Sequence, residues 1–521
     1  MPSRPQTIEA IVRVHAAERP AAAMTTFDGE TTTYGMMQTR SNRIAGALLA
    51  AGITPGDRIA LIAKNCTEYF ALLLGARKVG AVMVAVNWRL APDEMAFIIE
   101  DSQARLIFVA DEFAAGIASV SNRLGGVDQI IALEGVNSPY QNLQDWIAGY
   151  PDQDTHYASA ADEIALQLYT SGTTGRPKGV LLSNASLFSF VRTAEAAFGD
   201  DPHEVHLNAL PLFHVGGMNW SLQCFSHGAH CIAFSDFDPD EVIAEIERSG
   251  VTHLMTVPAV IKMLLDRPAV RQADLSSLRV VNYGGSTIAE KVLKDAVATM
   301  GNVFHGMYGA TELSFGLTLL TPAEHVDGAR PHLLRSAGRP VPGTEIRVVD
   351  PATMAEVAPG EKGEIWVKSP QRANGYWQRP EATAEIFRAD GWYRSGDMGH
   401  VEDGYIYLTD RLNDMVVSGG ENIYPAEVER VLLEHEAVGE AVAFGIPDAR
   451  WGEAVHAVVV PVPGRSIDEE TLIAFARERL ARFKCPRSVS FASDLIRNPS
   501  GKVLRAKMRE PYWEGWDRRI A

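Results

Sequence analysis

Short apolar runs recur through the first part of the chain, and they limit the folds open to it more than any other feature. Three of them span residues 58–63, 104–109 and 129–133. Runs of this length that are rich in Ile, Leu and Val are typical of strands buried on both faces. An amphipathic helix is predicted over residues 39–51. Helices that alternate with such strands indicate a parallel sheet covered on both sides.

The middle of the chain repeats this pattern, so a second sheet of the same kind is predicted. Residues 253–257, 278–283 and 303–307 have the composition of strands, and each leads into a loop rich in Gly, Ser or Thr. In open α/β sheets, ligands bind at the loops that leave the carboxyl ends of the strands. These loops are therefore expected to contribute to a binding site.

The pattern changes near residue 345. The segments 345–349, 363–367 and 405–408 alternate apolar and polar residues, which favours an antiparallel, barrel-like subdomain. Further on, helices are expected to begin at Pro425 and near Asp468, with strands between them.

These patterns together predict an α/β protein of two domains. The large N-terminal domain, residues 1–412, is expected to hold two doubly wound sheets and the β-barrel-like subdomain. The remainder, residues 413–521, is expected to form a small α+β C-terminal domain. A chain of 521 residues is too long for one hydrophobic core, which agrees with this division.

Charge and composition exclude several classes of protein. With 48 Lys and Arg against 65 Asp and Glu, the net charge is −17, so the surface repels nucleic acids and anionic lipids. The first residues lack the apolar core of a signal peptide, and no apolar run is long enough to span a bilayer. The four cysteines show no metal-binding spacing. We expect a cytoplasmic protein with no nucleic-acid partner and no integral membrane segment.

The strongest local sign of chemistry is the segment 169–180, which follows an apolar run and is rich in Thr, Ser and Gly. Gly residues let backbone N–H groups approach phosphate oxygens, hydroxyls donate further hydrogen bonds, and Lys178 supplies positive charge. A Walker P-loop is excluded because Lys178 is followed by Gly179. An ordinary flexible loop is the alternative. The predicted phosphate-binding residues are Thr170, Ser171, Gly172, Thr173, Thr174 and Lys178.

This segment resembles the phosphate loop of the adenylate-forming superfamily, which holds acyl-CoA synthetases, luciferases and peptide-synthetase adenylation domains. Further motifs that resemble the superfamily occur in its order at residues 210–217, 307–312, 393–397, 410–413, 418–425 and 498–502. The resemblance implies ATP, Mg²⁺ and coenzyme A (CoA) as cofactor and co-substrates. It also implies that the C-terminal domain is mobile and rotates between two half-reactions.

The same resemblance assigns roles in the adenylation step. Lys502 would bridge the substrate carboxylate and the α-phosphate. Glu312 would bind the metal beside Thr311, and His214 would separate the acid and nucleotide pockets, with a buried structural role as its alternative. Residues that would surround adenine are Gly284, Gly285, Ser286, Tyr308 and Gly309, and those that would meet the ribose are Asp397 and Arg411.

Roles in the second half-reaction follow in the same way, with a surface or packing role as the alternative for Arg89, Trp451 and Lys484. The residues expected to meet CoA are Arg89, Ser418, Gly419, Gly420, Trp451 and Lys484. Asn413 stands at the expected hinge, where the family usually carries Lys or Asp. Asn is small, polar and tolerant of unusual backbone angles, so we expect it to act as the hinge.

The predicted function is an ATP-dependent acid–CoA ligase. The acid pocket is expected among residues 214–220, 282–287 and 312–317, which are apolar, rich in Gly and free of Lys and Arg. If the small residues leave space in the pocket, they favour a medium- or long-chain fatty acid. The alternative is that the glycines are needed for backbone turns and leave no such space. An aryl or steroid-ring acid is the alternative substrate.

Three other classes of protein share part of this pattern, and single features separate them from an acid–CoA ligase. A stand-alone adenylation enzyme acting on a carrier protein stays open, but amino acid activation predicts an acidic residue where His214 follows Phe213. A luciferase-like oxygenase shares the adenylation motifs. A protein that retained only the fold would have lost Lys178, Glu312 or Lys502, which are all present. Homodimers are frequent among similar enzymes, so a homodimer is a further expectation.

Overall fold

The structure is a computed structural model, and it describes residues 4–136, 138–170, 177–286, 288–411, 414–418, 421–448, 452–480, 482–497 and 503–514. The chain divides into two compact units. The first comprises Met1–Glu345 and Val367–Tyr393, and the second comprises Ile346–Trp366 and Arg394–Ala521. This division does not test the domain boundary expected between residues 412 and 413, which stays a prediction.

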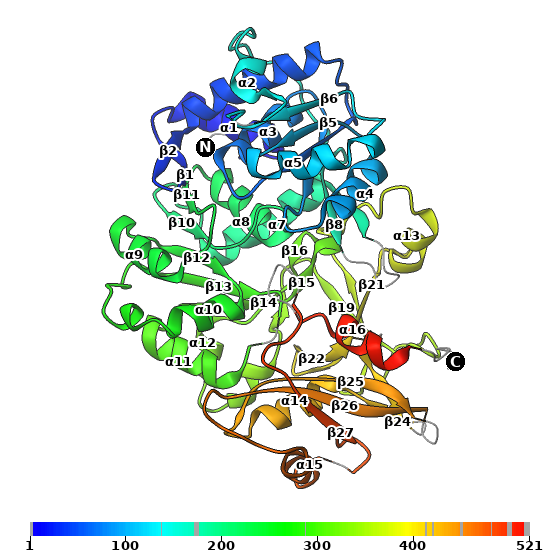
Figure 1. The fold of residues 1–521 in the computed structure, drawn as a ribbon. Coiled ribbons are helices and arrows are strands. Elements are labelled where there is room, and N and C mark those ends of the chain that lie inside the picture. The colour runs from blue at the N-terminus through cyan, green and yellow to red at the C-terminus, as the bar shows by residue number, and fades with distance from the viewer. Residues whose placement is uncertain are drawn as a thin grey trace. The chain divides into compact units, whose positions relative to one another are not determined.

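The first unit contains two seven-stranded sheets (Figure 1). One has the order β7 (Gln141–Asn142), β6 (Gln129–Ala132), β5 (Ala104–Val109), β3 (Arg58–Ile62), β4 (Val82–Val86), β8 (Ile164–Thr170) and β9 (Lys178–Ser183). All neighbours are parallel except β8 and β9. The three apolar runs of the first part of the chain are thus confirmed as strands.

The helices that connect these strands are α3 (Thr67–Arg77), α4 (Pro92–Ser102), α5 (Asp111–Ser119) and α6 (Leu143–Ile147), with a 3₁₀ turn at Ser121–Arg123, and α2 (Tyr34–Ala50) leads into β3. The helix predicted over residues 39–51 lies almost wholly within α2. It begins earlier than predicted because the Thr33 side chain accepts a hydrogen bond from the backbone N–H of Met36 and caps the first turn.

The second sheet has the order β14 (Phe304–Met307), β13 (Val280–Gly284), β12 (His253–Thr256), β10 (Val205–Asn208), β11 (His230–Ala233), β1 (Ala23–Phe27) and β2 (Glu30–Thr33). Only β1 and β2 are antiparallel neighbours. Its helices are α1 (Ile8–Glu18), α7 (Asn184–Phe198), α8 (Val215–Ser226), α9 (Pro239–Ser249), α10 (Pro258–Leu265) and α11 (Glu290–Met300). Leu207, Leu254 and Val281 are fully buried in the core of this sheet.

Short elements complete the first unit. Two small antiparallel pairs are β15 (Gly309–Ala310) with β16 (Phe315–Gly316), and β17 (Thr318–Leu319) with β18 (Arg339–Pro340). The remaining elements are 3₁₀ turns at Pro268–Arg271, Thr311–Leu313 and Pro331–Arg335, and the helices α12 (Pro322–His325) and α13 (Pro380–Ile386).

The second unit is built on two further sheets. One is a four-stranded sheet in the order β19 (Glu345–Val349), β20 (Gly363–Lys368), β21 (Tyr393–Glu402) and β22 (Tyr405–Arg411). The three segments predicted as strands after residue 345 are β19, β20 and β22, and β21 was not predicted. Asp403 and Gly404 join β21 to β22 and both have positive φ, as a tight hairpin turn requires.

The other sheet of this unit has the order β24 (Glu421–Ile423), β23 (Val416–Ser418), β26 (Gly452–Pro461) and β25 (Val438–Asp448), and β27 (Ser488–Phe491) pairs with β26. Its helices are α14 (Pro425–Leu433), α15 (Glu469–Arg477) and α16 (Arg505–Arg509), followed by a 3₁₀ turn at Glu510–Trp513. Val428, Val459 and Leu472 are fully buried between them. The predicted helix starts hold, since Pro425 opens α14 and Asp468 caps α15.

No helix within the described part of the chain is both long enough and apolar enough to cross a membrane.

Candidate active site

Several predicted site residues of the first unit lie at the carboxyl ends of parallel strands. Arg89 follows β4, Thr170 ends β8, His214 follows β10, Gly284 ends β13 and Tyr308 follows β14. In open α/β sheets this edge is the one where ligands bind. The loops of the two sheets also meet there, because the Asn65 side chain donates to the carbonyl oxygen of Leu210 at 3.0 Å and accepts from the N–H of Leu212 at 2.8 Å.

The two ends of the predicted phosphate loop lie opposite each other. Thr170 and Lys178 are register partners in the antiparallel pair β8–β9. Lys178 Nζ lies 5.2 Å from the centre of the Tyr376 ring, a distance at which the ammonium is attracted to the ring face. The strand pair therefore fixes a hydroxyl and a positive charge at the two ends of the loop.

Glu312 lies beside this pair. The Tyr376 hydroxyl donates to Glu312 Oε1 at 2.9 Å, and the Thr170 hydroxyl lies 3.5 Å from the same oxygen. The backbone N–H of Ala373 donates to the carbonyl oxygen of Glu312 at 2.8 Å, which holds the turn Thr311–Leu313 in place. Burial raises the pKa of the Tyr376 hydroxyl above its usual value, and the Glu312 charge raises it further, so this hydroxyl stays a donor.

The donor set around Glu312 suits Mg²⁺. Both hydroxyls approach Oε1, and the structure records no hydrogen bond of Oε2 within the described residues. Mg²⁺ is usually held by one or two carboxylates together with substrate phosphates and water. Glu312 is half-buried beside Thr170, and its second carboxylate oxygen could bind the ion.

The predicted adenine site is built by two neighbouring strand ends. Gly284 and Met307 are register partners on β13 and β14, so the segments that follow each strand lie next to each other. A Cβ at position 284 would lie 2.6 Å from the carbonyl oxygen of Met307, so only Gly permits this approach. Gly285, with φ +80, turns the chain, and Ser286 after it is exposed. The N–H of Tyr308 donates to the Thr318 hydroxyl at 3.2 Å, which fixes the backbone on the other side.

His214 caps the start of α8 and carries a buried ring nitrogen. Its Nε2 has no hydrogen-bond partner in the described structure, and its ring packs against Phe213 with centroids 4.4 Å apart. Burial, together with a smaller contribution from the nearby positive charge of Arg89, lowers the pKa of His214 to about 4. His214 is therefore neutral at physiological pH, and the predicted gate residue and a predicted CoA residue are close enough to interact.

The second unit positions its own predicted residues. Asp397 and Arg411 are register partners on β21 and β22. The Lys484 ammonium lies 2.8 Å from both carboxylate oxygens of Glu427 on α14. Ser418 pairs with Glu421 at the end of the β23–β24 hairpin.

Nine predicted site residues lie outside the described residues, and their roles stay predictions. They are Ser171, Gly172, Thr173, Thr174, Asn413, Gly419, Gly420, Trp451 and Lys502. The side chain of Arg411 also lies outside the description.

Tyr376 is the residue that the sequence analysis missed. It lies in the loop between β20 and α13, more than sixty positions after Glu312. The one sequence signal was the pair Tyr376–Trp377 directly after Gly375. An isolated bridge between Val180 and Tyr376, with hydrogen bonds that flank it, attaches this loop to β9.

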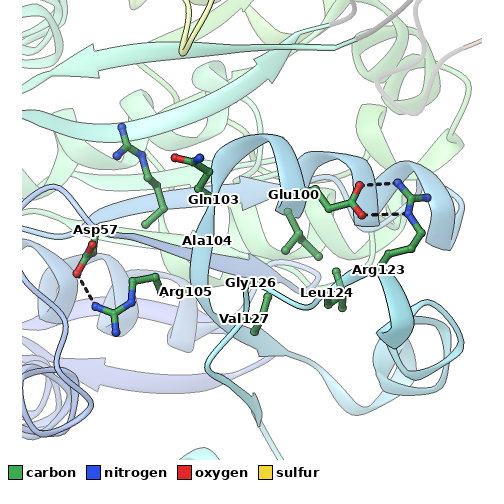
Figure 2. Close-up of a pocket in the computed structure, with 11 residues that line it drawn as sticks. Asp57, Glu100, Gln103, Ala104, Arg105, Arg123, Leu124, Gly126 and Val127 are labelled. Carbon is green, nitrogen blue, oxygen red and sulfur yellow. Dashed lines mark hydrogen bonds and ion pairs between the residues drawn. The ribbon is translucent and has the colours of Figure 1, made fainter.

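An open pocket of about 580 Å³ lies at the opposite edge of the first sheet, at the amino ends of β3 and β5 (Figure 2). Its positive side chains include Arg105, paired with Asp57 at 2.8 Å, and Arg123, paired with Glu100 at 2.6 Å. The pocket contains none of the predicted site residues. It is therefore separate from the candidate active site.

Comparison with known proteins agrees with this geometry. Residues 12–377 match the AMP-binding enzyme family, and residues 427–502 match the AMP-binding enzyme C-terminal domain. The chain is 39% identical to the fatty acid–[acyl-carrier-protein] ligase ScoC of Streptomyces coeruleorubidus, over 99% of this chain and 98% of that protein. It is 38% identical to a feruloyl-CoA synthase of Amycolatopsis sp, over 95% and 96% of the two chains.

Solved structures give the same result. ATP-bound MatB from Rhodopseudomonas palustris superposes with a TM-score of 0.89 at 30% identity, over 98% of this chain and all of that one. The chain therefore belongs to the AMP-binding enzyme family, the adenylate-forming superfamily that its motifs resemble. It is an enzyme of the acid–thiol ligase class, which activates an acid by adenylation.

Proposed function

We propose that this enzyme is an ATP-dependent acid–CoA ligase whose substrate is a medium- or long-chain fatty acid. The observation that carries the adenylation step is the convergence of Thr170, Lys178 and Glu312 at the ends of the phosphate loop. A positive charge, a hydroxyl and a carboxylate within one small region suit a nucleotide triphosphate with its metal ion.

In the first half-reaction, a carboxylate oxygen of the acid attacks the α-phosphorus of ATP. The new P–O bond makes acyl-AMP, and the bond to the β-phosphate breaks to release pyrophosphate. Lys178 offsets negative charge on the phosphates, and Glu312 would hold Mg²⁺, which neutralises the departing pyrophosphate when bound. Lys502 would hold the two reacting anions together.

In the second half-reaction, the CoA thiolate attacks the acyl carbonyl carbon. A C–S bond forms, the C–O bond to AMP breaks, and the products are acyl-CoA and AMP. The described cations that we assign to CoA are Arg89 and Lys484. Lys484 would exchange its ion pair with Glu427 for a contact with CoA.

The acid pocket is apolar but closely packed. A Cβ added at any of four glycines here would make a close contact. At Gly216 it would lie 3.1 Å from the Phe315 ring, and at Gly217 it would lie 2.5 Å from the carbonyl oxygen of Pro211. At Gly284 it would lie 2.6 Å from the carbonyl oxygen of Met307, and at Gly316 it would lie 2.1 Å from Met307 Cε. These glycines therefore permit close packing rather than leave a wide tunnel. Apolar side chains line the region, including Phe190 and Phe315 in an edge-to-face pair 5.4 Å apart. This packing does not distinguish an alkyl chain from a planar aryl acid, which is the alternative. The similarity to ScoC, whose name gives a fatty acid as its substrate, is what favours the alkyl chain.

The acceptor has one competing candidate. ScoC is a fatty acid–[acyl-carrier-protein] ligase, so a phosphopantetheine arm on a carrier protein is a second candidate thiol. CoA and a loaded carrier present the same thiol on the same arm, so adenylation does not distinguish them.

A matrix of acids and acceptors tests the proposal. Pyrophosphate release would be measured with fatty acids of graded chain length, ferulate and benzoate, each with CoA, with a phosphopantetheinylated carrier protein, and with no acceptor. CoA-dependent turnover that peaks with a fatty acid supports the proposal. If turnover requires the carrier protein, the acceptor is the carrier protein and not CoA. If activity peaks with an aryl acid, the substrate is that aryl acid and not a fatty acid. Release with none of these acids would contradict the proposal as a whole.

A further inference from the structure

A short hairpin carries the predicted metal ligand, and part of its backbone is strained. Its strands are β15 and β16, and Thr311 and Glu312 lie in the turn between them. Ser314 has φ +53 and Phe315 has φ +109. Residues other than Gly are uncommon at positive φ, and a bulky side chain there is a true outlier. Strain of this kind persists only where the surrounding structure holds it, so the contacts of this hairpin matter.

Asn219 on α8 makes one of these contacts. Its side-chain Nδ2 donates to the carbonyl oxygen of Ser314 at 2.6 Å, and both residues are fully buried. A carbonyl oxygen only accepts hydrogen bonds, so the amide nitrogen and not Oδ1 faces it. The N–H of Ser314 in turn donates to the carbonyl oxygen of Thr311 at 3.1 Å and closes the turn. Asn219 therefore holds the residue at which the metal-binding turn ends.

The packing of the hairpin leaves little freedom of position. A Cβ at Gly309 would lie 1.4 Å from the carbonyl oxygen of Phe315, so the two strands approach each other as closely as Gly permits. On α8, a Cβ at Gly216 would lie 3.1 Å from the Phe315 ring. One helix thus contacts the hairpin at two places, through Gly216 and through Asn219.

The same hairpin belongs to two predicted sites. Glu312 is the predicted metal ligand, and Phe315 lies in the predicted acid pocket, where its ring packs edge to face against Phe190 at 5.4 Å. Because only two residues separate Glu312 from Phe315, a change in backbone angles between them would move both side chains.

We propose that Asn219 is a positioning residue for adenylation, which holds the strained hairpin so that Glu312 faces the metal and Phe315 forms the wall of the acid pocket. The proposal rests on the proposed roles of Glu312 and of the acid pocket. Asn219 itself touches no reacting atom. Without its amide, the buried carbonyl of Ser314 loses a donor, the strained residues relax, and Glu312 and Phe315 shift together.

The test uses the full chain with two substitutions, Asn219→Leu and Asn219→Asp. Calorimetry measures how much Mg²⁺ increases the affinity for ATP, which requires no acid. Pyrophosphate release measures KM for whichever of dodecanoate, palmitate, ferulate and benzoate gives the highest wild-type rate. In both variants at pH 8, we expect the gain from Mg²⁺ to fall about tenfold and KM for the acid to rise several-fold. A purely structural role would lower the amount of folded enzyme and leave both quantities unchanged.

The Asn219→Asp variant adds a pH profile. An ionised carboxylate has no proton to donate to the Ser314 carbonyl, whereas the protonated form donates one. Burial favours the protonated form, and the charge of Glu312 on the same hairpin acts in the same direction. His214, at the start of α8, stays neutral over this range. The ratio of variant to wild-type kcat/KM should therefore rise as the pH falls from 8 to 6, and the ratio for Asn219→Leu should stay constant.

Two further variants serve as controls. Gln223→Leu makes the same amide-to-alkyl change one turn further along α8, at a buried side chain whose polar atoms have no hydrogen-bond partner in the described structure. It should leave the Mg²⁺ gain and KM unchanged. Glu312→Gln should abolish most of the Mg²⁺ gain. Circular dichroism would confirm that each variant is folded.

The proposal is overturned if both Asn219 variants keep the wild-type Mg²⁺ gain and KM, or if Gln223→Leu changes them as much. Glu312→Gln separates this outcome from a failure of the proposed function. If it abolishes the Mg²⁺ gain while the Asn219 variants keep it, only the role of Asn219 is wrong. If it also leaves the gain unchanged, the metal role of Glu312 is wrong as well. If Asn219→Leu does not fold, Asn219→Asp at pH 8 and pH 6 decides the question.

Discussion

Replacement of Tyr376 by Phe isolates the contact that positions Glu312. The change removes the hydroxyl that donates to Glu312 Oε1 at 2.9 Å. The ring remains, so its edge-to-face contact with Phe387 at 5.5 Å and its attraction for Lys178 are kept. Any loss of activity therefore reports the hydrogen bond rather than the packing.

The expected loss follows from the strength of that bond. A hydrogen bond to a charged group contributes about 1.5–3 kcal/mol, and about 1.4 kcal/mol corresponds to a tenfold change in rate. Tyr376 and Glu312 are half-buried, so the lower end of the range applies. We expect kcat/KM for ATP in the adenylation step to fall about tenfold, with a higher Mg²⁺ concentration needed for half-maximal rate, because Glu312 is no longer held in one orientation.

The assay is pyrophosphate release as a function of ATP and Mg²⁺ concentration. Tyr69→Phe is the matched control, since the buried Tyr69 hydroxyl on α3 has no hydrogen-bond partner in the described structure and its removal should leave both parameters unchanged. If Tyr376→Phe keeps wild-type kcat/KM and Mg²⁺ dependence, the reasoning that links this hydroxyl to Glu312 and the metal is refuted.

Three further outcomes are expected. Lys502→Ala should abolish pyrophosphate release yet still form thioester from supplied acyl-AMP, and equal loss of both steps would contradict its assignment. Lys484→Ala should raise KM for CoA several-fold and leave CoA-independent adenylation unchanged, whereas a matching loss in adenylation would show a structural role. Burial lowers the pKa of His214 to about 4, whereas an unfolded histidine titrates near 6.5, so the unfolded chain takes up a proton that the folded chain does not. The unfolding free energy should therefore fall as the pH drops from 6.5 toward 4. Urea denaturation at pH 7 and pH 5 should show a smaller fall for His214→Asn than for the wild type. Equal falls in the two proteins would contradict the buried-histidine assignment.

The class of fold follows from the pattern of apolar residues along the chain. Apolar runs such as 104–109 form buried strands, because a strand that is covered on both faces needs apolar side chains on both of them. The sequence also predicts the roles of Lys178 and Glu312. Phosphates need a positive charge beside them, and a metal ion needs a carboxylate ligand. The switch to alternating patterns near residue 345 likewise located the four-stranded sheet of the second unit.

Contacts between residues far apart along the chain are visible in the folded protein alone. Tyr376 reaches Glu312 because hydrogen bonds attach its loop to β9, a long-range pairing without a local signal. Gly216 and Gly316 were compatible with an open tunnel or a packed one, and the positions of Phe315 and Met307 decided for packing. Glu204, His206 and His253 likewise have no sequence spacing that places them side by side. They meet because parallel pairing of β10 with β12 joins residues far apart along the chain.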